Sequence, residues 1–84
     1  MTTLLYFAAI REKVGHGQEE MKLPDHLATA RDLVGWLRSR HEGYEYAFAD
    51  LSAVRVAIDQ AFAGFDDPIR SATEIAFFPP VTGG

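Results

Sequence analysis

The sequence predicts an α+β fold in which one mixed β-sheet packs against a single main helix. Three observations carry this prediction. The longest helical pattern lies near the middle of the chain, at residues 29–41, and strand-like segments flank it on both sides. These segments alternate apolar and polar residues, as expected for a sheet covered on one face and open to water on the other. The chain has 84 residues, which suits one domain with one core.

Residues 3–8 and 18–23 predict two neighbouring strands. In the first, period-two alternation separates two sets of side chains, Leu4, Tyr6 and Ala8 on one face and Thr3, Leu5 and Phe7 on the other. Thr3 marks the second set as the outer one, so Phe7 is expected to be an exposed aromatic residue. Residues 9–17 are expected to form a turn, because Gly15 and Gly17 suit unusual backbone angles.

The main helix is predicted to begin after Thr29, a good N-cap residue, and Asp32 resembles the third residue of a capping box. Its apolar residues recur at i, i+3, i+4 and i+7 and form one stripe: Ala30, Leu33, Val34 and Leu37. Gly35 inside this helix is expected to mark close packing against another element. Gly43 is expected to end the helix.

The second half of the chain predicts three more strands, at residues 52–58, 61–63 and 73–78. A two-residue turn, Asp59–Gln60, joins the first two. In the last strand, Phe77 is expected to face inward and Phe78 outward. Residues 44–51 are expected to form a loop with a helical turn over one end of the core.

The resulting element order is ββαβββ, with the first and last strands pairing in parallel at the centre of the sheet. A mixed sheet curled around one helix in this order is the β-grasp arrangement of ubiquitin-like proteins. We therefore predict a β-grasp domain at residues 1–78 and an extended C-terminal tail at residues 79–84.

Charge and hydropathy argue against several classes of protein. With 8 Lys and Arg against 12 Asp and Glu, the formal net charge is −4, whereas phosphate binding needs clustered cations. We therefore expect no nucleic-acid partner, and an acidic chain fits better as the docking partner of a basic protein surface. No apolar run approaches the roughly 18 residues of a membrane span, and no signal peptide opens the chain, so a cytoplasmic location is expected.

The sequence contains no convincing catalytic or metal site. There is no cysteine, hence no disulfide, no thiolate ligand and no thiol nucleophile. His16, His26 and His41 lack the spacing of metal ligands, so surface roles are expected for them. Asp66–Asp67 before Pro68 is typical of a turn. We expect no bound metal or cofactor and no catalysis by this chain alone.

The C-terminal tail combines a stiff stem with a slim tip. Pro79 and Pro80 remove two backbone donors and favour an extended conformation, and Gly83 and Gly84 present the thinnest possible backbone. Six residues reach at most roughly 20 Å, which suits insertion into a narrow channel of another protein. Small residues at a terminus also fit a disordered end, and the composition leaves both interpretations open.

The Gly84 carboxylate is the one functional group in a special position. A carboxylate resists nucleophiles because its charge repels them and oxide is a poor leaving group. Adenylation with ATP would supply AMP as a leaving group, and attack by sulfide or a persulfide would then give a thiocarboxylate. Such a terminus would carry sulfur without any cysteine.

Two segments of the chain resemble a known family. LYFAAIREKVG at residues 5–15 and EIAFFPPVTGG at residues 74–84 are similar to the small, sulfur-carrier subunit of molybdopterin synthase, the MoaD family. The resemblance covers essentially the whole chain. A terminal Gly-Gly is shared with other ubiquitin-like proteins, whereas the Phe-Phe-Pro-Pro approach to it is characteristic of this family.

The resemblance implies a function. The terminal glycine would be adenylated with ATP by an activating enzyme (an adenylyltransferase) related to ubiquitin-activating enzymes, and a persulfide protein would supply sulfur for the thiocarboxylate. The tail would then enter the large synthase subunit, which holds the catalytic residues, and convert cyclic pyranopterin monophosphate to the molybdopterin dithiolene. The complex would be a heterotetramer.

The resemblance also assigns residues. Gly84 would be the acyl carrier and Gly83 the slim neck, with Pro79, Pro80, Val81 and Thr82 as the inserted stem. The family docks its partners through an apolar surface beside the tail, for which the outward-facing residues Phe7, Phe62 and Phe78 are the candidates.

Other functions stay open. A carrier for thiazole synthesis or tRNA thiolation shares the Gly-Gly end, a protein modifier would join Gly84 to lysines, and a binding module could present Pro79–Pro80 as a ligand, although a P-x-x-P pattern is missing. Asp59 stands where the family often has Asn, and residues 71–73 replace an Asp-Gly-Asp-like turn. These departures concern local turn geometry.

Overall fold

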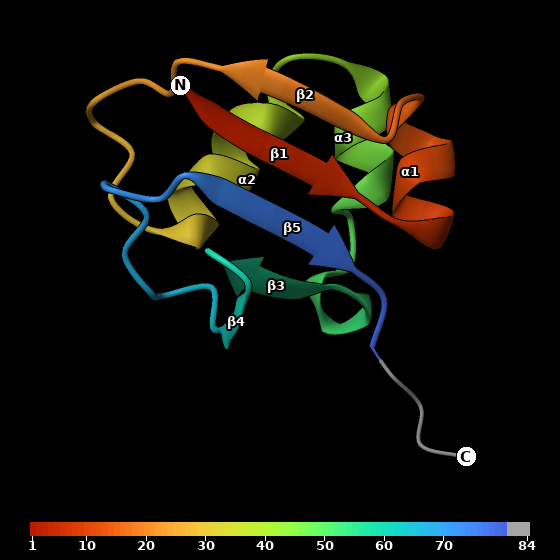
Figure 1. The fold of residues 1–84 in the computed structure, drawn as a ribbon. Coiled ribbons are helices and arrows are strands. Elements are labelled where there is room, and N and C mark those ends of the chain that lie inside the picture. Colours follow the sequence, from red (N-terminus) through yellow and green to blue (C-terminus); the bar gives the residue numbers. More distant parts are fainter. Residues whose placement is uncertain (81–84) are drawn as a thin grey trace.

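The structure, a computed structural model, describes residues 1–80. It contains one five-stranded sheet with strand order β2-β1-β5-β3-β4. The strands are β1 (Thr2–Tyr6), β2 (Gln18–Met21), β3 (Arg55–Ile58), β4 (Ala61–Ala63) and β5 (Glu74–Phe78). The helices are α1 (Ala8–Val14), α2 (Ala30–Arg38), α3 (Glu42–Ala47) and a 3₁₀ turn η1 (Leu51–Ala53). Helices α2 and α3 lie behind the sheet, and no helix covers the face toward the viewer (Figure 1).

The two central strands pair in parallel, and every other pairing is antiparallel. β1 runs beside β5 with Tyr6 opposite Phe77, while β2 and β3 flank this central pair. β3 and β4 form a hairpin whose turn residues, Asp59 and Gln60, both have positive φ, at 51° and 70°. Two positive φ angles twist the hairpin in the direction that the sheet requires. The predicted mixed sheet and β-grasp topology are confirmed.

The core lies between the sheet and the helices. Tyr6 and Phe77 project from the central strands, and the Phe77 ring stacks on Tyr6 and meets Phe48 edge-on, with centroid distances of 6.0 Å and 4.9 Å. The predicted α2 stripe closes the core from the other side, and all four of its residues are buried: Ala30, Leu33, Val34 and Leu37. Burial of these apolar side chains is the main stabilising term of the fold.

The amino end of α2 has the predicted capping box. The Thr29 hydroxyl accepts a hydrogen bond from the Asp32 amide at 3.2 Å, and the Asp32 carboxylate accepts one from the Thr29 amide at 3.1 Å. Two otherwise unpaired amide groups of the first turn are thereby satisfied.

The segment predicted to be a turn, residues 9–17, contains α1. Ile10 and Val14 lie one turn apart on this helix and are both buried. Gly15 ends the helix with a φ of 101°, so the part of the prediction that used this glycine was correct. Ala8 is exposed at the start of the helix rather than on the inner face of a strand.

The two glycine predictions for the main helix were wrong. Helix α2 ends at Arg38, and Gly43 lies inside the separate helix α3. A Cβ atom at Gly43 would lie 2.6 Å from the Lys13 carbonyl oxygen of α1, whereas a Cβ at Gly35 would meet nothing within 4 Å. Close packing therefore requires a glycine between α1 and α3, and Gly35 faces open space.

A carboxylate on β2 ties α3 and the connection after α1 to the sheet. Glu19 Oε2 accepts hydrogen bonds from the hydroxyl groups of Tyr6, at 2.7 Å, and Tyr44, and it lies 3.0 Å from His16 Nε2. These partners come from β1, the connection after α1, and α3. One partly buried charge therefore holds three elements in place.

This cluster shifts the pKa values of its members in opposite directions. Burial by itself would raise the pKa of Glu19, but hydrogen bonds from Tyr44, His16 and Tyr6 together lower it below the ordinary 4.5. Burial, followed by the bond to Glu19, raises the pKa of Tyr44 to about 12 and also raises that of Tyr6. The cluster is thus built for an ionised Glu19 and neutral tyrosines.

Replacing Gly35 by Ala should stabilise the protein. The position is helical, exposed and sterically open, so alanine should raise the free energy of unfolding by about 0.5–1 kcal/mol. Gly15→Ala is the matched control. Because Gly15 has a left-handed φ, this substitution should lower the free energy of unfolding by about 1–2 kcal/mol. Urea denaturation of both variants measures the difference, and a destabilised Gly35→Ala would contradict the open environment.

Glu19→Gln should destabilise the protein in a pH-dependent way. Since the pKa of Glu19 is lowered in the folded state, its stabilising contribution is complete above its ordinary value and is lost as the pH falls through the folded-state value. The melting temperature should therefore drop strongly at about pH 7 and much less at about pH 3. Glu20→Gln, on the next and exposed residue of β2, is the control and should change little at either pH. If the difference in melting temperature between Glu19→Gln and the wild type does not change with pH, the ionised form of Glu19 is not what stabilises the cluster.

Candidate functional site

The site begins where the chain leaves the sheet at the carboxyl end of β5. Up to this point β5 is paired on both sides, with Tyr6 opposite Phe77 and Arg55 opposite Phe78. Pro79 and Pro80 follow, and because they lack an N–H group the ladder cannot continue. These two residues, the stem, are half-buried and lead the chain away from the sheet (Figure 1).

A groove beside the stem supports it from the helix side. It lies between α1, α3 and η1, and most of its lining is apolar: Ala9, Ile10, Lys13, Tyr46, Ala47, Ala49, Asp50, Ala53, Val54, Pro79 and Pro80. Tyr46 at its edge is 72% exposed. The base of the stem therefore rests on apolar surface.

The uncovered side of the sheet beside the stem is apolar as well. The pairing registers place its outward side chains in one continuous surface, which we call the open face: Leu5, Phe7, Ala57, Phe62, Ala76 and Phe78. Phe62 is 84% exposed and its ring lies 5.8 Å from that of half-buried Phe78. The structure thus brings together the three phenylalanines that the sequence nominated from separate strands.

Phe7 is held firmly at the corner between the sheet and α1. Its amide donates to the Phe77 carbonyl at 3.1 Å, which extends the central pairing by one residue. Its own carbonyl accepts from the amides of Ile10 and Arg11 at 3.1 Å and 3.3 Å, so Phe7 is the N-cap of α1. Phe7 is 48% exposed and its side chain belongs to the open face, as expected from the alternation.

Helix α1 adds a functional candidate that the sequence prediction missed. Arg11 lines a shallow pocket on the open-face side together with Leu5, Phe7 and Gln18. It reaches this position because Ala8, with a φ of 52°, turns the chain sharply from β1 into the helix. The i, i+4 spacing of Ile10 and Val14 was the signal that could have revealed this helix.

The other predicted site residues, Val81, Thr82, Gly83 and Gly84, lie outside the described residues. Their assigned roles in the tail stay predictions. The described residues show where the stem leaves the sheet and which surfaces, the groove and the open face, lie on its two sides.

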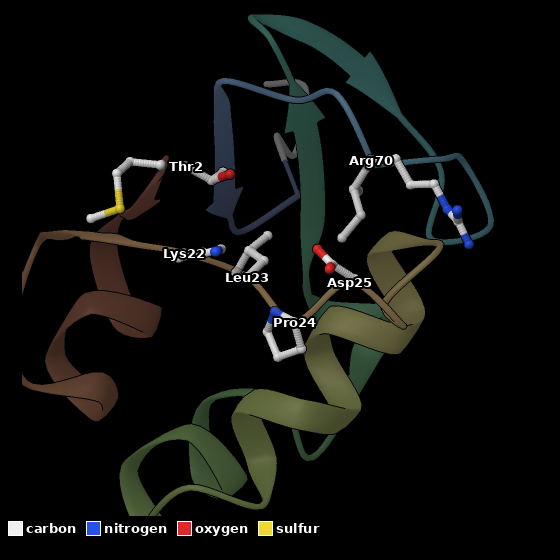
Figure 2. Close-up of a pocket in the computed structure, with 8 residues that line it drawn as sticks. Thr2, Lys22, Leu23, Pro24, Asp25 and Arg70 are labelled. Carbon is white, nitrogen blue, oxygen red and sulfur yellow. The ribbon is translucent and has the colours of Figure 1, made fainter.

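A second pocket lies at the opposite end of the sheet. Its lining comes from the amino end of β1, the segment after β2 and the loop before β5: Met1, Thr2, Lys22, Leu23, Pro24, Asp25, Ile69 and Arg70 (Figure 2). The Arg70 guanidinium points away from Lys22 and Asp25 (Figure 2). The charged groups do not converge, so this pocket offers no chemistry.

The described part of the chain has no cluster of side chains suited to a metal ion and no helix that could span a membrane. Residues 1–80 contain no group of three or more His, Asp or Glu side chains placed to hold a metal ion. No helix in the same range is long and apolar enough to cross a membrane.

Comparison with known proteins gives a consistent result over the full length. The chain is similar to two proteins named molybdopterin synthase sulfur carrier subunit. The one from Escherichia coli is 33% identical over 84 residues, covering 100% of both chains. The one from Haemophilus influenzae is 34% identical over 84 residues, again with 100% coverage of both.

Solved structures agree with the fold. SAMP1 from Haloferax volcanii matches with a TM-score of 0.74 and 24% identity, covering 99% of this chain and 98% of the other. A protein from Pyrococcus furiosus matches with a TM-score of 0.72 and 28% identity, covering 95% and 97%. The sequence model of the ThiS family matches residues 4–84, so the chain belongs to the ThiS family.

Proposed function

We propose that this chain is the sulfur carrier subunit of a molybdopterin synthase, with the C-terminal carboxylate of Gly84 as the group that bears sulfur. The observation that carries the proposal is the full-length correspondence to two sulfur carrier subunits, at 33% and 34% identity. The Gly-Gly end and the Phe-Phe-Pro-Pro approach lie within the matched region.

The chemistry follows from the reactivity of a carboxylate. Adenylation by an activating enzyme consumes ATP, releases pyrophosphate and leaves AMP bonded to the Gly84 carbonyl. A persulfide on a second protein then displaces AMP, and cleavage of the S–S bond by a thiol leaves the terminal thiocarboxylate. Transfer of that sulfur to cyclic pyranopterin monophosphate, with water restoring the carboxylate, would build the dithiolene in two rounds.

The geometry supports delivery of the tail by docking. The stem leaves the sheet between an apolar groove and the open face, so a partner that covers the open face is adjacent to the tail from the start. Phe7, Phe62 and Phe78 give that partner exposed aromatic surface, the kind of side chain enriched at protein interfaces. A docked domain converts tail insertion into a nearly intramolecular event, which raises the effective concentration of the reacting group.

The proposal assigns the remaining parts to other proteins. The large synthase subunit would hold the catalytic residues, an E1-like adenylyltransferase would bind ATP, and a persulfide protein would supply sulfur. Two carriers would serve one product in a heterotetramer located in the cytoplasm. This chain would bind no cofactor itself.

Intact mass spectrometry after co-expression with the activating enzyme tests the chemistry. Exchange of one oxygen for sulfur at Gly84 should add about 16 Da to the chain. Mixing this form with the large subunit and cyclic pyranopterin monophosphate should then yield dithiolene product. Recovery of Gly84–lysine conjugates alone would indicate a protein modifier, and a thiocarboxylate that yields no dithiolene would indicate a carrier for another pathway.

Gly84→Ala, or one residue added after Gly84, should lower the rate of sulfur transfer by about tenfold or more, because the reacting carbonyl would be displaced or crowded. The melting temperature should stay that of the wild type, since this end lies beyond β5. Gly35→Ala is the matched control, the same change at a remote exposed site, and its transfer rate should be normal. If Gly84→Ala lowers the melting temperature as well as the rate of sulfur transfer, the tail has a structural role.

A further inference from the structure

The open face carries opposite charges at its two ends. Arg55 lies opposite Phe78 at the end where the stem departs, and Arg11 lies beside Phe7 at the same end. At the other end Glu74 and Glu20 both lie opposite Thr3, one on each side of it. The apolar row from Leu5 to Phe62 runs between these two charged ends.

The two arginines at the stem end are available to a partner. Within residues 1–80 neither Arg11 nor Arg55 has a carboxylate oxygen within 4.0 Å, whereas Arg31 and Arg38, in α2 on the helix side, each form an ion pair. Arg55 Nη1 donates to the carbonyls of Val54 and of Ser52 in η1, at 3.2 Å and 3.3 Å. These bonds hold its guanidinium against η1 without neutralising it.

The carboxylates at the far end are equally uncompensated. Glu20 is exposed, and its carboxylate accepts a long hydrogen bond from the Thr3 hydroxyl at 3.5 Å, which is a weak interaction. Glu74 is half-exposed, and its carboxylate has no cationic partner among the described residues. The backbone turn next to it adds Asp59, whose Oδ1 accepts from the amides of Thr73 and Glu74 at 2.8 Å and 3.0 Å.

We infer that the open face binds the large synthase subunit in one orientation, and that the charges at the two ends of this face fix that orientation. The partner surface has an apolar centre, carboxylates facing Arg11 and Arg55, and cationic side chains facing Glu20 and Glu74. An apolar patch alone would accept a partner rotated by half a turn, but that rotation would bring like charges together, which opposes binding. The inference rests on the proposed function, since it specifies the surface that guides the tail.

Association kinetics of the full chain with the large synthase subunit test the orientation. Arg55→Glu, Arg11→Glu and Glu20→Lys should each lower the association rate constant by about three- to tenfold at low ionic strength, and added salt should shrink the effect. Arg31→Glu and Glu42→Lys are matched controls that make the same charge changes in the helices behind the sheet, and they should change the rate less than about twofold. Melting temperatures confirm that each variant is folded.

The outcomes separate the inference from the function on which it rests. Binding by the wild type with open-face variants that match their controls would overturn the fixed orientation and leave the proposed function standing. Faster association of Arg55→Glu or Arg11→Glu would show a basic partner surface at the stem end and would also overturn it. If the wild-type chain does not bind the large subunit, the proposed function fails and the orientation fails with it.

Discussion

The parallel pairing of β1 with β5 is the constraint on which the rest of the structure depends. It joins the first strand to the last, so the stem emerges beside the residues that follow β1 rather than at a free edge of the sheet. With Tyr6 opposite Phe77, the next residues on both strands, Phe7 and Phe78, face outward together. A shift of one residue in this register would turn Phe77 to solvent and Phe78 into the core, and would remove the open face.

A second set of contacts keeps the elements around the stem in place. Parallel strands need a long crossover, and here the crossover includes α1 and α3, which meet at the stem end of the sheet. Gly43 lets these helices approach closely, and Glu19 fastens α3 and the connection after α1 to the sheet through hydrogen bonds to its carboxylate. The open face and the stem therefore belong to one rigid surface, which is what delivery of a terminal group by docking requires.

Much of this could be predicted from the sequence, because alternation along strands and the i, i+4 stripe of α2 are strong local signals. They predicted the sheet, the main helix and the separation of Phe77 from Phe78. Helix α1 was missed because its two buried residues, Ile10 and Val14, come just before Gly15 and Gly17, and the two glycines favour a turn. The contrast between Gly35 and Gly43 could not be foreseen, since the requirement for a missing Cβ arises from the approach of a distant backbone.

The length of the tail explains why orientation at the open face matters for chemistry at its end. Six residues beyond β5 reach at most about 20 Å, so a tilt of the docked domain by about 10° would move the tip by about 3 Å. Misplacement by about 1 Å can cost a reaction about a hundredfold in rate. An apolar patch constrains tilt and rotation weakly, because hydrophobic contact is non-directional. Charged groups at both ends of the open face would fix the tilt and rotation of the docked domain. Because the two prolines of the stem are stiff, the orientation of the domain would then set the direction in which the tail leaves it.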